Sequence, residues 1–317
     1  MVNFNDIINA RKRIQKYISI TPLDFSTNLT KGDRKVYLKL ECQQKQKAFK
    51  IRGALSKLTS LNDEEKNNGV YAISSGNHGA GVSYAAYLLG IENAKVFVPK
   101  TTPKAKIHKI KYYGAEVVQV GENYDDVHRI VRDKLDNNNM TYVHPGSDLQ
   151  VIAGQGTIGL EIMEQNPDID VIIVPIGGGG LITGISIAAK HINPNVKIIG
   201  VQTEACPAMV KSLQDDVFHE EYPSDDSLCD ALIGGVFDIP YRMAKQCIDD
   251  IIVVKESDIK KATTLLLTEE KIVAEPSSAT GVAALLANPK LFDENNVAII
   301  ISGGNLDKEL MKKLIRE

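Results

Sequence analysis

A lysine lies between two large apolar residues in the segment KAFKIRGA, residues 47–54. The segment follows VYLKLEC, which is typical of a β-strand, and it begins a helical pattern. Lys50 therefore either points to water or is a buried amine with a depressed pKa. An amine of the second kind can form a Schiff base and then move a proton, so Lys50 is a candidate catalytic residue.

Four successive glycines follow an apolar strand and precede a helix: Gly177, Gly178, Gly179 and Gly180. Such a turn can direct backbone N–H groups and the positive end of the helix dipole to one point, which suits a phosphate. A simple strand–helix turn would need fewer glycines. Gly184 is followed by no lysine, which excludes a Walker loop, and isoleucine occupies position 182, where a dinucleotide fingerprint needs glycine. Glu204 lies after the next strand and keeps a nucleotide-binding alternative open.

A second polar turn between a strand and a helix contains Ser74, Ser75, Gly76, Asn77 and His78. Helix N-terminal amides, together with hydroxyl and amide side chains, suit a small carboxylate. The alternative is simple capping, with Asn77 as the N-cap and His78 as a satisfied capping histidine.

Two further turns carry polar residues. Ser302, in ISGGNLD (301–307), closes a buried strand, so its hydroxyl is expected at the same end of the sheet as the four glycines. Glu275, in VAEPSSATG (273–281), precedes a helix and is either a helix-entry residue or a site group.

Strands and helices must alternate to position these turns. β-Branched runs predict strands at 36–41, 70–73, 94–99, 115–120, 171–176, 197–202, 250–254 and 297–302. Helical patterns occupy 49–60, 78–89, 104–113, 123–136, 149–165, 181–191, 256–269 and 277–287. Pro103 is expected as a first helical residue and Asp307 as an N-cap, while 136–140 and 215–230 are expected to be surface loops. The alternation predicts an α/β fold, a parallel sheet with helices on both faces.

Composition narrows the functional classes. The 317 residues carry a net charge of −3, which gives no general attraction for nucleic acid or an anionic membrane. The sequence contains no apolar run of membrane-spanning length, and its N-terminus lacks signal-peptide features, so a cytoplasmic protein is expected. Its four cysteines are far apart, which argues against a disulfide framework and against a zinc site.

The motifs, in this order, resemble the fold type II (β-family) pyridoxal-phosphate enzymes, specifically the serine/threonine dehydratase and serine racemase branch. The match extends from TPLDFS (21–26) to ISGGNLD and includes HPGSDLQVIAGQGTIGLEI (144–162). The resemblance implies a tryptophan-synthase-β-like fold of two open, twisted, mostly parallel sheets with helices on both faces. It also implies a large cofactor-binding domain, residues 1–48 and 146–317, and a small α/β domain, residues 49–145.

The resemblance assigns roles to the residues of the cofactor site. Lys50 would form the Schiff base with pyridoxal 5'-phosphate and afterwards take the substrate Cα proton. Phe49 would lie beside the pyridine ring, Asn77 at its 3-hydroxyl and Ser302 at its nitrogen. The glycines 177–180 would bind the phosphate. A serine does not force protonation of the ring nitrogen as an aspartate would, and this favours elimination over transamination.

The expected reaction is β-elimination from L-threonine or L-serine, which gives a 2-oxo acid and ammonia. The substrate carboxylate would bind the turn from Ser74 to His78. The alternative is a serine racemase with accompanying dehydratase activity, in which Lys50 and Ser75 act on opposite faces of the Cα carbanion. A 3-hydroxyaspartate dehydratase, a β-replacement enzyme and a non-enzymatic phosphate- or nucleotide-binding protein are further alternatives.

The sequence also departs from the branch at particular positions. Ala48 stands where serine is usual, and Ala231 stands where a glycine is common, which weakens the substrate assignment. Some relatives bind a divalent cation through a glutamate matching Glu204 and an acid six residues later; that later residue is Val210 here, so no metal is expected.

The basic helix 104–114 is expected to be a solvated face, with an effector site as the alternative. A homodimer is expected from the resemblance.

Overall fold

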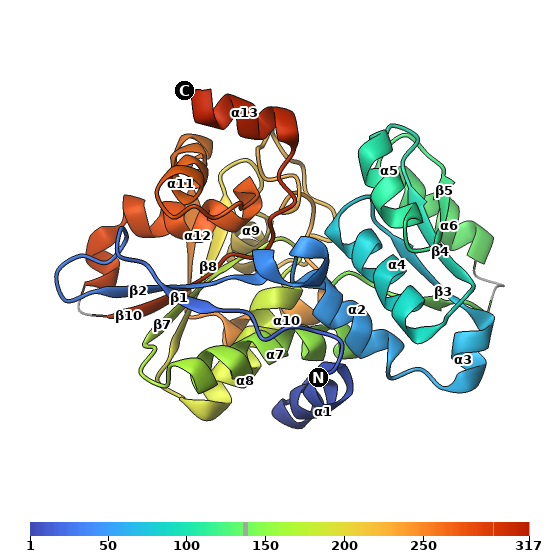
Figure 1. Ribbon diagram of the computed structural model, residues 1–317, viewed down its shortest axis with the longest axis horizontal. Coiled ribbons are helices and arrows are strands. Elements are labelled where there is room, and N and C mark those ends of the chain that lie inside the picture. The colour runs from blue at the N-terminus through green and yellow to red at the C-terminus, as the bar shows by residue number, and fades with distance from the viewer. Residues whose placement is uncertain (136–138, 294, 317) are drawn as a thin grey trace.

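The computed structural model describes residues 1–135, 139–293 and 295–316. In this part of the chain the strands form two separate sheets, one of six strands and one of four. Figure 1 shows the four-stranded sheet and its helices on the right and the six-stranded sheet with its helices on the left. The mixed α/β fold expected from the strand–helix alternation is therefore present.

The larger sheet has the order β1-β2-β10-β7-β8-β9. Its strands are β1 (Leu23–Phe25), β2 (Lys35–Lys39), β7 (Val171–Pro175), β8 (Lys197–Thr203), β9 (Asp250–Val254) and β10 (Asn296–Ile300). Only β1 pairs antiparallel among these strands; the other pairs are parallel. All five residues of β7 are buried, as its unbroken apolar run predicts for a strand covered on both faces.

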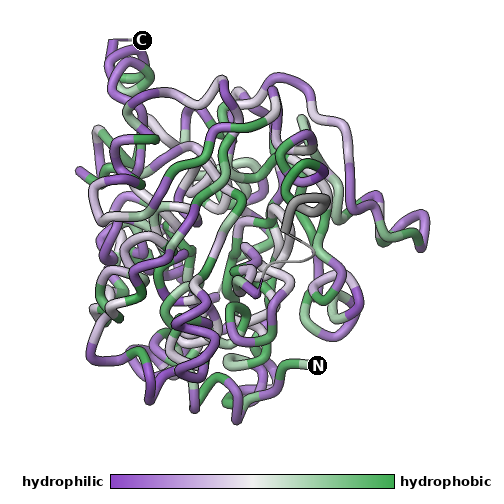
Figure 2. Tube along the Cα trace, turned by 90° about the vertical axis from the view of Figure 1, so that its right-hand side faces the viewer, coloured by the Kyte–Doolittle hydropathy of each residue, from purple (hydrophilic) through white to green (hydrophobic). Residues whose placement is uncertain are grey.

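Helices cover both faces of the larger sheet. Apolar side chains of α11 (Glu256–Thr268) and α12 (Pro276–Ala287) pack on one face, while α7 (Leu149–Gln165) and α8 (Gly180–Ile192) contribute to the core on the other (Figure 1). Figure 2 shows hydrophobic stretches running through the interior of the trace and hydrophilic ones concentrated at its periphery. Burial of these apolar surfaces is the main force that holds the layers together.

The smaller sheet is parallel and has the order β5-β4-β3-β6. Its strands are β3 (Val70–Ile73), β4 (Ala94–Val98), β5 (Glu116–Gln119) and β6 (Thr141–Tyr142), and the helices between them are α4 (Asn77–Leu89), α5 (Lys104–Lys111) and α6 (Tyr124–Leu135). Helix α2 (Lys50–Leu58) lies between this group and the larger sheet and packs against both α4 and α7 (Figure 1).

The remaining helices are mostly peripheral. They are α1 (Phe4–Ile14), α3 (Asp63–Asn68), α9 (Ala208–Asp215), α10 (Asp238–Cys247), α13 (Lys308–Arg316) and three 3-10 turns, η1 (Glu41–Gln43), η2 (Lys45–Lys47) and η3 (Pro289–Phe292). Within the part of the chain that the structure describes, no helix is long and apolar enough to cross a membrane.

The eight expected strands and the eight expected helices are present, and none of their ends shifts by more than two residues. β1 and β6 were not expected because strands of three and two residues carry no readable periodicity. The loop expected at 215–230 begins where α9 ends, whereas 136–138 of the Asn-rich segment lie outside the described residues. Pro103 is the N-cap of α5 rather than its first residue, and Asp307 caps α13 as expected.

Candidate active site

The site residues come together because three neighbouring parallel strands end at one edge. β2, β10 and β7 lie side by side, so the segments that follow them leave the sheet at the same end. Ser302 and the glycines from Gly177 follow β10 and β7 directly. Ala48 forms a bridge with Gly303, and the Phe49 N–H donates to the Ser302 carbonyl oxygen at 3.0 Å. This short pairing brings the start of α2 to the same edge.

Lys50 is the first residue of α2 and is partly buried. Its Nζ donates to the carbonyl oxygen of Pro145 at 2.9 Å and lies 5.2 Å from the centre of the Phe49 ring. Burial lowers the pKa of the amine to about 8, because the charged form is poorly solvated there. Of the two alternatives for this lysine, the structure therefore supports the amine with a depressed pKa.

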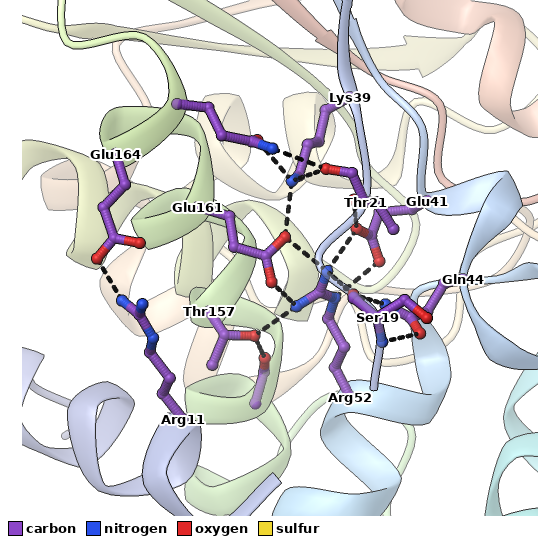
Figure 3. Close-up of polar contacts among 12 residues, drawn as sticks. Arg11, Ser19, Thr21, Lys39, Glu41, Gln44, Arg52, Thr157, Glu161 and Glu164 are labelled. Atoms are coloured by element: carbon purple, nitrogen blue, oxygen red, sulfur yellow. Dashed lines mark hydrogen bonds and ion pairs between the residues drawn. The ribbon is translucent and has the colours of Figure 1, made fainter. Parts of the chain in front are cut away.

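A buried network of charges anchors the first turn of α2 (Figure 3). Arg52 donates through Nε and Nη2 to Glu41 at 2.8 Å each, and through Nη1 and Nη2 to Glu161 at 2.6 and 2.9 Å. Lys39 donates to the same Glu161 at 2.7 Å and to the Thr21 carbonyl oxygen at 2.8 Å. Two cations thus balance two carboxylates and join α2, β2, η1 and α7, with Arg52 two residues after Lys50 on α2.

The polar turn after β3 is built differently from a simple helix cap. Gly76 is the N-cap of α4 and Asn77 is the first helical residue, so the expectation of Asn77 as the N-cap is wrong. Its side chain instead reaches across to Glu275, with 2.9 Å between Nδ2 and Oε1. Ser74 receives the Gly76 N–H at 3.2 Å, and Ser75 lies in the same turn, partly buried. Because no side chain caps α4, the backbone N–H groups at its N-terminus remain available to an anion.

Two buried histidines flank this turn and the lysine. His78 does not cap the helix as expected; its Nε2 lies 2.7 Å from the Val143 carbonyl oxygen, and burial lowers its pKa to about 3. His144 accepts the backbone N–H groups of Gly146 and Ser147 on Nδ1, and burial lowers its pKa to about 4. Both imidazole rings are therefore neutral. By accepting the two N–H groups, the His144 ring stabilises the turn whose Pro145 carbonyl oxygen faces Lys50.

The four glycines are required by their surroundings as well as by any ligand. Gly179 is the N-cap of α8 and has a φ of +94°, a conformation that side chains rarely adopt. A Cβ on Gly178 would overlap the Phe237 ring, and one on Gly180 would lie 2.9 Å from the Cα of Gly146. A Cβ on Gly177 would lie 3.2 Å from the Ala231 carbonyl oxygen, which brings the loop 229–235 to this turn. Packing therefore explains part of the glycine run, and the open helix N-terminus remains suited to phosphate.

The turn after β10 holds a chain of hydroxyl groups. Ser302 is 5% exposed, and its Oγ lies 3.0 Å from the Oγ of Ser278. Ser278 also accepts the Gly303 N–H at 2.7 Å and donates to the Gly303 carbonyl oxygen at 2.8 Å. A Cβ at Gly303 would lie 3.0 Å from the carboxyl carbon of Glu275 and 3.3 Å from Nδ2 of Asn77. Ser302, Asn77 and Glu275 therefore converge on this turn.

Sequence reasoning left out several residues that shape this site. Pro145 lies in a motif that supported the family resemblance, but nothing in the motif showed that its carbonyl faces Lys50. The partnership of Arg52, Glu41 and Glu161 spans more than a hundred residues, so no local pattern reveals it. Glu275 was recognised only as a candidate.

Glu204 takes part in a local structural role. Its Oε1 accepts the backbone N–H of Glu256 at 3.1 Å, at the start of α11. Val210 donates its backbone N–H to Gln202 at 3.0 Å. The described residues contain no group of three or more His, Cys, Asp or Glu side chains that could hold a metal ion. The four cysteines, Cys42, Cys206, Cys229 and Cys247, are buried, as expected of small hydrophobic residues.

Comparison with known proteins identifies the family. Residues 14–303 match the family described as pyridoxal-phosphate dependent enzyme. The chain is 40% identical over its full length to the L-threonine ammonia-lyase of Thermotoga maritima, of which it covers 79%, and 40% identical over 97% of its length to a catabolic L-threonine dehydratase of Staphylococcus aureus, of which it covers 90%. Maize serine racemase superposes with a TM-score of 0.92 at 34% identity, covering 99% of this chain and 97% of that one.

The chain belongs to the pyridoxal-phosphate dependent enzymes. The expected family and fold are confirmed, and pyridoxal phosphate is the cofactor of this enzyme. The residues present suit that cofactor chemically: a partly buried amine of lowered pKa, a glycine-lined helix N-terminus for the phosphate, and amide and hydroxyl side chains for the ring.

Proposed function

We propose that the chain is an ammonia-lyase that converts L-threonine or L-serine to a 2-oxo acid and ammonia. The proposal rests on the meeting of Lys50, Ser302 and the glycine turn at one sheet edge, in a chain 40% identical to a relative named L-threonine ammonia-lyase. The cofactor, when bound, withdraws electrons from the substrate Cα and so acidifies its proton.

In this proposal the chain's residues divide the work. Lys50 takes the Cα proton, and its lowered pKa keeps a useful fraction of the amine neutral near pH 8. The β-hydroxyl then leaves with a proton as water. The resulting enamine tautomerises and takes up one water, which releases ammonia and the 2-oxo acid. The N-terminus of α4, from Ser74 to His78, holds the substrate carboxylate.

Phe49 would hold the ring of the cofactor on one side, with Asn77 at its 3-hydroxyl and Ser302 at its nitrogen. Gly177 to Gly180 would hold the phosphate. A hydroxyl both donates and accepts, so Ser302 does not force a proton onto the ring nitrogen as a carboxylate would. A neutral ring nitrogen at Ser302 would therefore favour departure of the β-hydroxyl over transamination.

A serine racemase with accompanying dehydratase activity is the second candidate. Ser75 lies in the turn at the start of α4, and the maize serine racemase shares the fold across nearly the whole chain. In that case the Ser75 hydroxyl supplies a proton to the face of Cα opposite Lys50. The variant Ser75→Ala then loses racemisation and keeps much of the elimination.

Product analysis separates the candidates. We expect the purified holoenzyme to release 2-oxo acid and ammonia from L-threonine and L-serine, measured by NMR, with Lys50→Ala inactive. Chiral chromatography detects any D-isomer, and threo-3-hydroxyaspartate and a sulfur nucleophile test the remaining alternatives. D-serine formed alongside pyruvate would favour the racemase, whereas no 2-oxo acid from any substrate contradicts the lyase proposal.

Some expectations from the sequence stay predictions. The domain bounds, 1–48 with 146–317 and 49–145, would be tested by limited proteolysis, and the homodimer by analytical ultracentrifugation. Cell fractionation would test the cytoplasmic location.

A further inference from the structure

One lysine of the basic helix α5 turns inward, contrary to the expectation of a fully solvated face. Its neighbour Lys106 is exposed, whereas Lys109 is partly buried and burial lowers its pKa. The Lys109 Nζ donates to the Asn305 Oδ1 at 2.6 Å and to the Gln46 carbonyl oxygen at 3.3 Å. Lys109 therefore joins the helices of the smaller sheet to the loop that follows β10.

The hydrogen bonds continue from Asn305 into the candidate active site. Asn305 Nδ2 lies 2.6 Å from the Oδ1 of Asn77 and 3.0 Å from the carbonyl oxygen of Gln46. Asn77 Nδ2 in turn lies 2.9 Å from the Oε1 of Glu275. A single line of polar contacts thus connects the surface helix α5 with the two side chains that converge on the turn after Ser302.

The partners at the outer end fix which way this line runs. An asparagine amide can turn over and exchange its oxygen with its nitrogen, so its neighbours decide its orientation. Lys109 can only donate and the Gln46 carbonyl can only accept, so Asn305 must direct Oδ1 to the lysine and Nδ2 to the carbonyl. Nδ2 then donates to Asn77, which must present Oδ1 to Asn305 and Nδ2 to Glu275.

The inner end cannot enforce this direction by itself. Burial raises the pKa of Glu275 to about 7, so near neutral pH its carboxyl is protonated in many molecules and can then donate as well as accept. Glu275 therefore tolerates either orientation of the Asn77 amide, and the partners at the outer end, Lys109 and the Gln46 carbonyl, select one. The Asn77 Nδ2 carries two hydrogens and donates one to Glu275, so the other N–H can donate to a ligand.

We propose that Lys109 is a positioning residue that sets the direction of the Lys109–Asn305–Asn77 hydrogen bonds, so that Asn77 offers an N–H to the ring oxygen of the cofactor. The inference rests on the role proposed above for Asn77. It assigns to α5 a function that its exposed, basic sequence hides.

The test measures cofactor binding as well as turnover. Lys109→Met removes the donor and keeps the aliphatic stem, while Lys109→Arg keeps a donor. Asn305→Asp still accepts from Lys109 but has no N–H to give Asn77. The matched control, Lys106→Met, removes an exposed cation of the same helix that pairs with Asp230. Each variant is titrated with pyridoxal phosphate, and the absorption spectrum of the bound cofactor is recorded.

We expect Lys109→Met and Asn305→Asp to bind pyridoxal phosphate about tenfold more weakly, as loss of one hydrogen bond to a charged oxygen implies. Their visible absorption should also fall relative to the near-ultraviolet, because the anionic ring oxygen loses its donor. Lys109→Arg and Lys106→Met should match the wild type. An unchanged affinity and spectrum in Lys109→Met, with both altered in Asn77→Ala, would overturn the inference and leave the role of Asn77 intact. If Asn77→Ala itself changes neither, the proposed role of Asn77 fails, and the inference fails with it.

Discussion

Removal of Arg52 is the most informative perturbation of the charge network in Figure 3. The guanidinium lies between Glu41 and Glu161, forms two hydrogen bonds with each and is fully buried. Arg52→Met keeps much of the side-chain volume and removes the charge. Lys39 then balances only one of the two carboxylates, and a net negative charge is left in the interior.

The cheapest response of the variant is to protonate one carboxyl. This costs about 1.4 kcal/mol for each pH unit above an ordinary glutamate pKa of about 4.3, hence about 4 kcal/mol near pH 7 and about 1 kcal/mol near pH 5. The neutral-pH figure agrees with the loss of roughly 3–5 kcal/mol found when one partner of a buried ion pair is removed. The destabilisation should therefore shrink by about 3 kcal/mol between the two pH values.

The sign follows from the folded-state carboxylate. The cations Arg52 and Lys39 hold the pKa of Glu161 below its usual range, against the effect of burial. That pKa difference stabilises the wild type above the unfolded-state pKa of the carboxyl, and the stabilisation is lost as the pH falls through the folded-state pKa. In Arg52→Met the lowering is weakened, so acid should relieve the variant rather than harm it further.

Urea unfolding of the cofactor-saturated protein near pH 7 and near pH 5 measures the effect. Arg52→Met combined with Glu41→Gln should lose most of the pH dependence, because Lys39 and Glu161 then balance each other. The control is Lys57→Met, on the same helix as Arg52, which breaks a partly exposed ion pair with Asp148 and should cost about 1 kcal/mol or less at both pH values. An equal loss at both pH values in Arg52→Met would refute the electrostatic account and leave only lost packing.

Three further predictions concern the site itself. Capture of pyridoxal phosphate by the apoenzyme should accelerate as the pH rises through about 8, the lowered pKa of Lys50, because only the neutral amine attacks; stopped-flow absorbance measures this, and a rate independent of pH contradicts it. Gly178→Ala should weaken cofactor binding at least tenfold, since the new methyl overlaps Phe237, and Phe237→Ala should restore part of the affinity in a titration. Burial raises the pKa of Glu275 from 4.5 to about 7, so the folded protein holds a proton that the unfolded chain releases, and stability falls as the pH rises over that range; Glu275→Gln should remove this slope in denaturant unfolding, and an unchanged slope counts against it.

More of the fold than of the candidate active site could be predicted from the sequence. Long apolar and amphipathic runs such as β7 and α7 were readable because their periodicity spans several residues, whereas the two-residue β6 was not. The chemical types of the site residues were also readable, since an amine, a glycine turn and a serine each imply a chemistry by themselves. The capping alternative for Asn77 was wrong because its neighbours along the chain suggest a helix start, whereas the partner of its side chain, Glu275, is distant in the sequence.

By itself the sequence determined the α/β class and the turns where polar residues gather, because these follow from local periodicity and side-chain chemistry, and it made Lys50 a candidate that the family resemblance singled out as the reactive amine. The tertiary structure alone decided that Pro145 faces that amine, that Arg52 is held between two carboxylates and that Lys109 reaches Asn305. Each of these contacts joins residues far apart in the chain. They form only after packing brings α2, α5 and α7 against the strand ends. Their burial also strengthens the charge interactions and hydrogen bonds, because the interior has a lower dielectric constant than water.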